Sequence, residues 1–304
     1  MLESGTEYYY ITTVANAAAV INDVEENTVT IEGKLAMGTV SFIGTEDEQA
    51  IVNIASNAEV TSGNVTLDNA RLNVISGAQF TATVTDGNGS VDVKIVSQEE
   101  TSATAAPSFS ENTKDGFVVG DNASGAEMTF NGTVIVTDLT VSKMTVEGTV
   151  TIDGTSTSVT ETLQINGTVT VQNGVLTATN AKTFVNGELT AIEATADSKD
   201  VGNAELGDTY VGIGLGDDEK TLVDGNAGTI VGNVVATIAY VSSDSTVPED
   251  MISGDNVKST QFYVDDALWM TAYTADASAN KAKVPNAPVT DALFMGWNLS
   301  LIHI

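Results

Sequence analysis

The chain has 304 residues, 42% of them apolar, which is enough to bury a hydrophobic core and excludes wholesale disorder. It carries 41 acidic and 11 basic residues, and its net charge of −30 argues against nucleic acid or anionic membrane as a partner. Cysteine is absent, which excludes disulfides, thiolate metal sites and cysteine nucleophiles.

Residues 1–25 contain the one segment with a helical pattern, over residues 11–24. Thr12 or Thr13 can cap its start, and its apolar residues recur at helical spacing: Val14, Ala17, Ala18, Ile21 and Val24. We expect this helix to cover the open apolar end of a stack of strands, as a terminal cap does in repeat proteins.

Residues 26–100 read as a first block of short strands. Valine and isoleucine alternate with threonine, which suits a pleated surface with one buried face. The clearest strands are predicted at residues 28–31, 64–67, 72–75 and 91–96. Residues 101–120 begin with T-S-A-T-A-A-P-S-F-S, which interrupts the pattern and predicts a linker or excursion.

A short motif recurs in the second block, residues 121–255. The copies are F-N-G-T-V, V-E-G-T-V, I-N-G-T-V and V-N-G-E-L, with their glycines at Gly132, Gly148, Gly167 and Gly187. The interval from one glycine to the next is similar each time. An earlier copy, T-I-E-G-K-L-A, has its glycine at Gly33.

This repeat has two interpretations. Asn-Gly between alternating residues is a strong hairpin signal, which would give tandem antiparallel β-sandwiches. A phrase that returns about every 20 residues instead indicates stacked coils. Tryptophan is absent before Trp269, so the sandwich would lack a large aromatic core residue. The sequence therefore predicts an all-β chain that favours a parallel β-helix, with tandem sandwiches as the alternative.

Residues 256–298 read as a separate small module. Four aromatic residues surround an Asp-Asp pair, which predicts a hairpin: Phe262, Tyr263, Trp269 and Tyr273. The end of this module, V-P-N-A-P-V-T-D-A-L-F-M-G-W-N, resembles the internalin-type (Listeria–Bacteroides) repeat through Phe294, Gly296 and Trp297. That resemblance implies a β-grasp-like extracellular module.

The rest of the chain resembles the adhesin-like β-helix surface proteins of archaea and bacteria, in its cap segment and its N-G-T-V repeats. This resemblance implies an extracellular or cell-surface location, and partners among surface glycans or host and cell-surface proteins. No apolar run reaches the roughly 18 residues of a membrane span, so we expect no direct insertion into a membrane.

The last six residues, L-S-L-I-H-I at 299–304, are the translation of a transposon sequencing adapter in one reading frame. We expect the natural chain to diverge after Asn298 and the last module to be truncated. His303 is the only histidine, so its exclusion leaves no histidine for a catalytic or metal site.

The most suggestive short run is G-I-G-L-G-D-D-E at 212–219. Asp217, Asp218 and Glu219 supply the carboxylates that calcium prefers, and an exposed acidic loop is the alternative. No other cofactor is expected. Glycosylation sequons occur at Asn64, Asn88, Asn122, Asn131 and Asn166, two of them inside the N-G-T turn.

These observations predict a non-enzymatic surface protein that serves display or attachment. The alternative is a carbohydrate-active or carbohydrate-binding β-helix, since paired carboxylates can hydrolyse glycosides. With 41 acidic residues, however, close carboxylate pairs arise by chance and carry little information. A groove of aromatic and acidic side chains along one face would favour the carbohydrate-active or carbohydrate-binding β-helix. A smooth face of threonine, serine and asparagine would favour the non-enzymatic surface protein.

Overall fold

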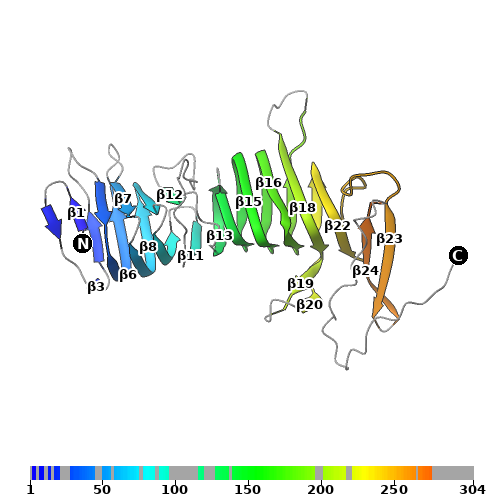
Figure 1. Cartoon of the computed structure of the whole chain (residues 1–304), viewed down its shortest axis with the longest axis horizontal. Coiled ribbons are helices and arrows are strands. Elements are labelled where there is room, and N and C mark those ends of the chain that lie inside the picture. Colours follow the sequence, from blue (N-terminus) through cyan, green and yellow to red (C-terminus); the bar gives the residue numbers. More distant parts are fainter. Residues whose placement is uncertain are drawn as a thin grey trace.

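The computed structural model describes residues 2–4, 7–9, 13–14, 17–20, 28–44, 50–55, 58–74, 78–85, 89–95, 116–119, 127–136, 139–195, 201–216, 221–264 and 266–275. All of the regular secondary structure in these residues is β-strand, which confirms the predicted all-β class but not the predicted cap helix. The strands stand side by side along an elongated body (Figure 1).

A first sheet has six strands. In sheet order they are β12 (Gly116–Val119), β9 (Ala70–Val74), β7 (Ala50–Ile54), β5 (Thr28–Ile31), β1 (Leu2–Ser4) and β2 (Glu7–Tyr9). The strands from β12 to β5 are parallel to one another, whereas β1 is antiparallel to both β5 and β2. The predicted strands at 28–31 and 72–75 are thereby confirmed as β5 and β9.

A second sheet has sixteen strands. In chain order they are β3 (Thr13–Val14), β4 (Ala17–Val20), β6 (Lys34–Ile43), β8 (Glu59–Asp68), β10 (Gln79–Thr85), β11 (Gly89–Ile95), β13 (Glu127–Val136), β14 (Leu139–Val146), β15 (Thr149–Ile165), β16 (Thr168–Val185), β17 (Glu188–Ala191), β18 (Gly202–Val211), β21 (Thr229–Gly232), β22 (Val234–Ser242), β23 (Lys258–Val264) and β24 (Ala267–Thr274). A separate two-stranded hairpin consists of β19 (Ile213–Leu215) and β20 (Leu222–Asp224).

Most neighbours in the large sheet are parallel, and the offset between paired residues is about 20 in one part of it but longer farther along the chain, as between Val185 and Val211. Thr149 of β15 pairs with Thr168 of β16, and Thr168 pairs in turn with Glu188 of β17. In the first sheet Ala50 pairs with Ala70, which repeats the same step along the chain. The parallel pairing shows that the hairpin interpretation of Asn166–Gly167 is wrong, because the strands on either side of it do not pair with each other as a hairpin.

Three glycines of the repeated motif lie over one another: Gly148, Gly167 and Gly187. The carbonyl oxygen of Gly148 accepts a hydrogen bond from the amide of Thr168, and that of Gly167 accepts one from Glu188. A β-carbon on Gly167 would collide with the carbonyl of Gly148, and one on Gly187 would collide with that of Gly167. At Gly167 and Gly187 each backbone therefore passes too close to the previous one to admit a side chain, whereas a β-carbon on Gly33 would meet nothing within 4 Å.

One continuous core is shared by the two large sheets. Because neighbouring side chains in a strand point to opposite faces, every second residue enters this core. One row of paired core residues crosses six strands and is buried throughout: Phe130, Val146, Ile165, Val185, Val211 and Val241. Such rows align apolar side chains from strand to strand, here one phenylalanine followed by valine and isoleucine.

The predicted helix at 11–24 is wrong. Within it, Thr13–Val14 and Ala17–Val20 are strands β3 and β4, which pair in parallel with β6. The physical reason is tertiary: the edge of β6 offers hydrogen-bond partners to an incoming strand, and this outweighs the helix propensity of the alanines. The region thus extends the sheet. Ile21 and Val24 lie outside the described residues.

The sheet changes direction at two places. β11 is antiparallel to both β10 and β13, so it is a single reversed strand between two parallel runs. At the far end, β24 is antiparallel to β22 and forms a hairpin with β23, which confirms the hairpin predicted around Asp265 and Asp266. This hairpin continues the large sheet. Residues 276–304, including the F-x-G-W motif and the last six residues, lie outside the described residues.

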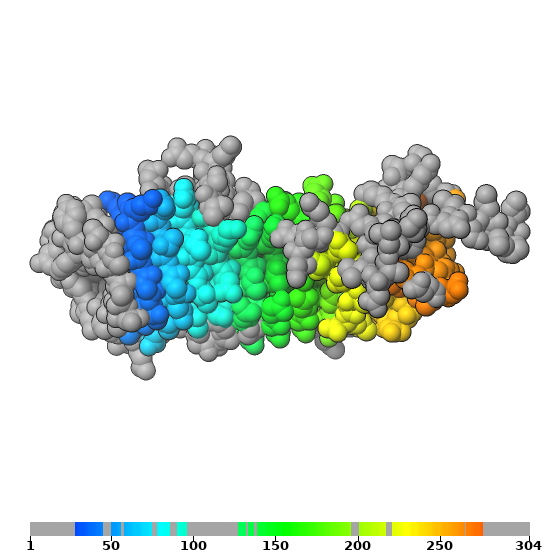
Figure 2. Space-filling model, turned by 90° about the horizontal axis from the view of Figure 1, so that it is seen from below, coloured from blue at the N-terminus to red at the C-terminus, as the bar shows by residue number. Residues whose placement is uncertain are grey.

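The predicted linker at 101–120 is described only at its end. There Gly116–Val119 forms β12, which returns to pair with β9 of the first sheet. The predicted strands at 64–67 and 91–96 are confirmed within β8 and β11. Figure 2 shows these blocks following one another along the body from blue to orange.

Candidate functional site

The predicted calcium ligands Asp217, Asp218 and Glu219 lie outside the described residues, and calcium stays a prediction. The preceding residues Ile213–Leu215 form β19. Within the part of the chain that the structure describes, no three histidine, cysteine or acidic side chains are close enough together to hold a metal ion.

The asparagines of three predicted sequons bond to neighbouring strands. Asn166 donates to the Glu147 carboxylate at 2.8 Å, and Asn131 donates to Asp92 at 3.4 Å. Asn64 accepts a bond from the Thr85 hydroxyl at 3.3 Å. These side chains link successive strands across the outer surface, so the structure gives them a stacking role that does not require glycosylation. Asn88 and Asn122 lie outside the described residues.

An ion-pair cluster lies where the reversed strand meets the second parallel run. Glu127 of β13 lies between Lys94 of β11, at 3.3 Å, and Lys143 of β14, at 3.5 Å. Burial alone would raise the pKa of Glu127, but the hydrogen bond from Lys94 and the charges of both lysines outweigh it and hold the pKa below its usual value. A groove of about 330 Å³ runs beside this cluster.

Replacing Glu127 with glutamine is expected to reduce stability at neutral pH by less than about 1 kcal/mol, as is usual for exposed pairs. Because the folded-state pKa is lowered, the carboxylate contributes fully above its unfolded pKa of about 4.3, and the contribution is lost as the pH falls below that value. Urea unfolding at pH 7 and pH 3 measures the difference. Glu161→Gln, at an exposed position of β15, is the control; an equal effect of both variants, or no pH dependence, would contradict the assignment.

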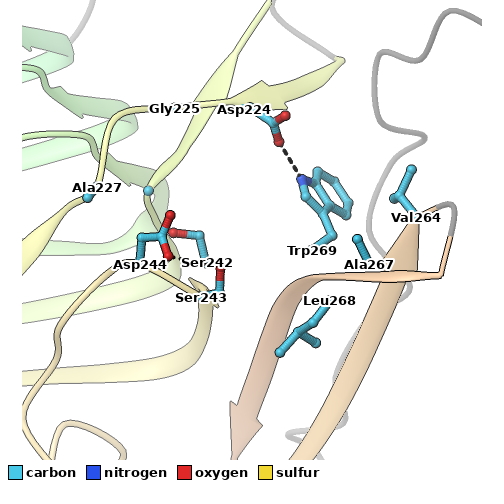
Figure 3. A pocket seen from close by; sticks show the side chains of 11 residues that line it. Asp224, Gly225, Ala227, Ser242, Ser243, Asp244, Val264, Ala267, Leu268 and Trp269 are labelled. Carbon is cyan, nitrogen blue, oxygen red and sulfur yellow. Dashed lines mark hydrogen bonds between the residues drawn. The ribbon is translucent and has the colours of Figure 1, made fainter.

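A cavity of about 430 Å³ lies at the C-terminal end of the described structure, and we call it the C-terminal pocket. It lies between the β19–β20 hairpin, the end of β22 and the β23–β24 hairpin (Figure 3). It is lined by Gly212, Asp224, Gly225, Ala227, Ser242, Ser243, Asp244, Val264, Ala267, Leu268 and Trp269.

The two sides of the C-terminal pocket differ in chemistry. On one side the indole nitrogen of Trp269 donates a hydrogen bond to Asp224 at 2.8 Å. On the other side lie Ser242, Ser243 and Asp244 (Figure 3). The Ser242 and Ser245 hydroxyls are 2.8 Å apart, and Ser245 also accepts a bond from the amide of Gly228 at 2.9 Å. The pocket therefore presents one aromatic and one hydroxylic, acidic side.

A second apolar cluster supports this pocket from the outer face of the sheet. Phe184, Tyr210 and Tyr240 occupy paired positions on β16, β18 and β22, and their rings stack at centroid distances of 5.0 and 4.7 Å. Ile213 and Leu222 of the β19–β20 hairpin belong to the same cluster. The cluster holds this hairpin against the sheet, and burial raises the pKa of the Tyr210 hydroxyl above its ordinary value.

Sequence reasoning placed Trp269 in a hairpin but did not connect it with the other pocket residues. Asp224 lies 45 residues before it, and Ser242 to Asp244 follow the end of β22. The available signals were the D-G-N run at 224–226 and the S-S-D-S run at 242–245, which look like ordinary turns. Only the order of strands in the sheet brings these turns together.

The sequence matches no known protein family, and no curated protein or solved structure is significantly similar to it. Among the described residues, no helix is long and apolar enough to cross a membrane.

Proposed function

We propose that this chain is a non-enzymatic structural segment of a cell-surface, adhesin-like protein, built as a parallel β-helix that serves display or attachment. The observation that supports this most is the repeated parallel register of β13, β15, β16 and β17, whose paired residues Thr133, Thr149, Thr168 and Glu188 follow one another at similar steps, with Gly148, Gly167 and Gly187 stacked at the same corner. Repetition of this kind extends a surface by adding equivalent units, and each unit contacts only its neighbours.

The outer surface supports the same proposal. On β15 and β16 the outward positions carry small polar side chains, with Thr149 paired to Thr168 and Thr151 paired to Thr170. The Asn173 side chain donates to Asp153 at 2.6 Å, and this bond joins the same two strands. A smooth polar face is the feature that favours a structural surface over a carbohydrate-active groove along the strands.

The charge of the chain sets the expected partners. A net charge of −30 disfavours nucleic acid and anionic lipid, and it favours neutral or cationic surfaces such as glycans and surface proteins. Strong self-repulsion also keeps neighbouring copies apart, which suits a protein displayed at high density.

The proposal predicts that antibody against residues 28–275 labels intact, unpermeabilised cells that express the full-length product. Purified protein is expected to leave pectins, glucans and mannans uncleaved, as measured by release of reducing ends. Permeabilised cells provide the control for total antigen. Labelling that needs permeabilisation would contradict the surface location, and cleavage abolished by one Asp→Asn or Glu→Gln substitution would support the carbohydrate-active alternative.

A further inference from the structure

We propose that the C-terminal pocket is a binding site for a neutral saccharide. This inference does not depend on the surface function proposed above, because it follows from the chemistry of one cavity. Its volume of about 430 Å³ lies within the range of about 300–1,000 Å³ that is usual for small-ligand sites.

The aromatic side of the pocket is fixed in place. Trp269 is half-buried and packs against the second apolar cluster, while its indole nitrogen is bonded to Asp224 at 2.8 Å. Because the only polar atom of the indole already has a partner, what the ring offers a ligand is apolar surface. The apolar side chains of Val264 and Leu268 continue this side (Figure 3). Such a surface suits the C–H face of a sugar ring.

The opposite side offers both donors and acceptors. The Ser243 hydroxyl donates to the Asp244 carboxylate at 3.3 Å, which leaves the Ser243 oxygen and the second carboxylate oxygen as acceptors, and the Ser242 hydroxyl can both donate and accept. The Ser242 hydroxyl is also in contact with that of Ser245, which accepts a hydrogen bond from the Gly228 amide. These two bonds restrict the positions of the Ser242 and Ser245 hydroxyls. A sugar hydroxyl matches both kinds of group because it can itself donate and accept.

Charge narrows the class of ligand further. Two carboxylates line the pocket, on Asp224 and Asp244, and no lysine or arginine is among its lining residues in the described structure. An anionic sugar such as a uronate would therefore be repelled. A neutral sugar satisfies the aromatic and the hydroxylic sides together.

The first experiment uses the two tryptophans of the chain. In the full chain with Trp297→Phe, the remaining fluorescence comes from Trp269 alone. Methyl glucoside, methyl mannoside, methyl galactoside and N-acetylglucosamine are titrated separately, with glucuronate and tetramethylammonium as charged probes. We expect a saturable change in emission with at least one neutral sugar and none with glucuronate. Saturation by tetramethylammonium alone, or by no neutral sugar, would overturn the proposal.

Variants then test the residues, with calorimetry as the readout because it does not need Trp269. Trp269→Ala and Asp244→Asn are each expected to weaken sugar binding about tenfold or more. Asp244 is exposed, so its variant tests the site even if Trp269→Ala fails to fold. Tyr263→Ala is the matched control, since this exposed aromatic residue of β23 does not line the pocket. Equal loss in the control, or unchanged binding in Asp244→Asn, would overturn the assignment. Neither result depends on whether the protein reaches the cell surface.

Discussion

Replacing Gly167 with alanine is expected to destabilise the protein by about 3 kcal/mol or more, which is at the upper end of overpacking effects. The added β-carbon would collide with the carbonyl oxygen of Gly148. That carbonyl cannot simply move away, because it accepts a hydrogen bond from Thr168 at 2.8 Å. Relief of the collision would therefore separate two strands that are paired on both sides of the corner.

Urea unfolding followed by circular dichroism measures this loss, and Gly33→Ala is the matched control. Gly33 has a φ of +72°, yet a β-carbon there would meet nothing within 4 Å. Its replacement should cost only the left-handed backbone conformation, about 1–2 kcal/mol. Comparing the two variants thus separates the energetic cost of the backbone collision at Gly167 from that of the left-handed backbone conformation at Gly33. A loss at Gly167 no larger than that at Gly33 would show that the stacked corner relaxes easily.

Replacing Tyr210 with alanine is expected to cost about 3–5 kcal/mol, as for other large aromatic side chains in a core. Tyr210 is 8% exposed and lies between Phe184 and Tyr240 in the stack of rings. Its removal would open a cavity between two strands and under the β19–β20 hairpin. Thermal unfolding measures the overall loss, and limited proteolysis within residues 213–224 reports whether the hairpin detaches first.

Tyr210→Phe is the control, because it keeps the ring and removes the hydroxyl. The pKa of this hydroxyl is raised by burial first, and then by Tyr240 and Asp208. A raised folded-state pKa means that its stability contribution is complete below the unfolded pKa of about 10 and is lost as the pH rises above it. The phenylalanine variant should therefore lose less stability than the wild type between pH 9 and 11. A large loss at neutral pH in this variant would contradict a purely packing role.

The sequence predicted those strands that an alternation of apolar and polar residues marks locally. It did not predict structure that depends on pairing with a distant strand. Alternating valine and threonine located the strand at 28–31, and the recurring glycine predicted the steps between β13, β15, β16 and β17. The alanines at 17–19 also fit a helix, and only the open edge of β6 makes that segment a strand. Propensity cannot supply that information, because the partner is a different part of the chain.

The C-terminal pocket could not be predicted from the sequence for a related reason. Asp224 and Trp269 are far apart in the sequence, and they meet because β24 returns antiparallel to β22 beside the β19–β20 hairpin. No periodicity in the sequence encodes that return. The calcium prediction at 217–219 rests on glycines followed by three carboxylates, and it stays a prediction because these residues lie outside the described ones.

The similar offsets between β15, β16 and β17 have a consequence for how this part of the sheet can vary in length. Inserting or deleting a single residue between Gly148 and Gly167 would move every following side chain of that strand to the opposite face. A change of one whole unit, such as the step from Thr168 to Glu188, would leave each core row and the glycine corner aligned. Each added unit would lengthen the body by about 4.8 Å, the spacing between neighbouring strands. The length of such a protein can thus change only by whole units, and each added unit repeats the same lateral surface.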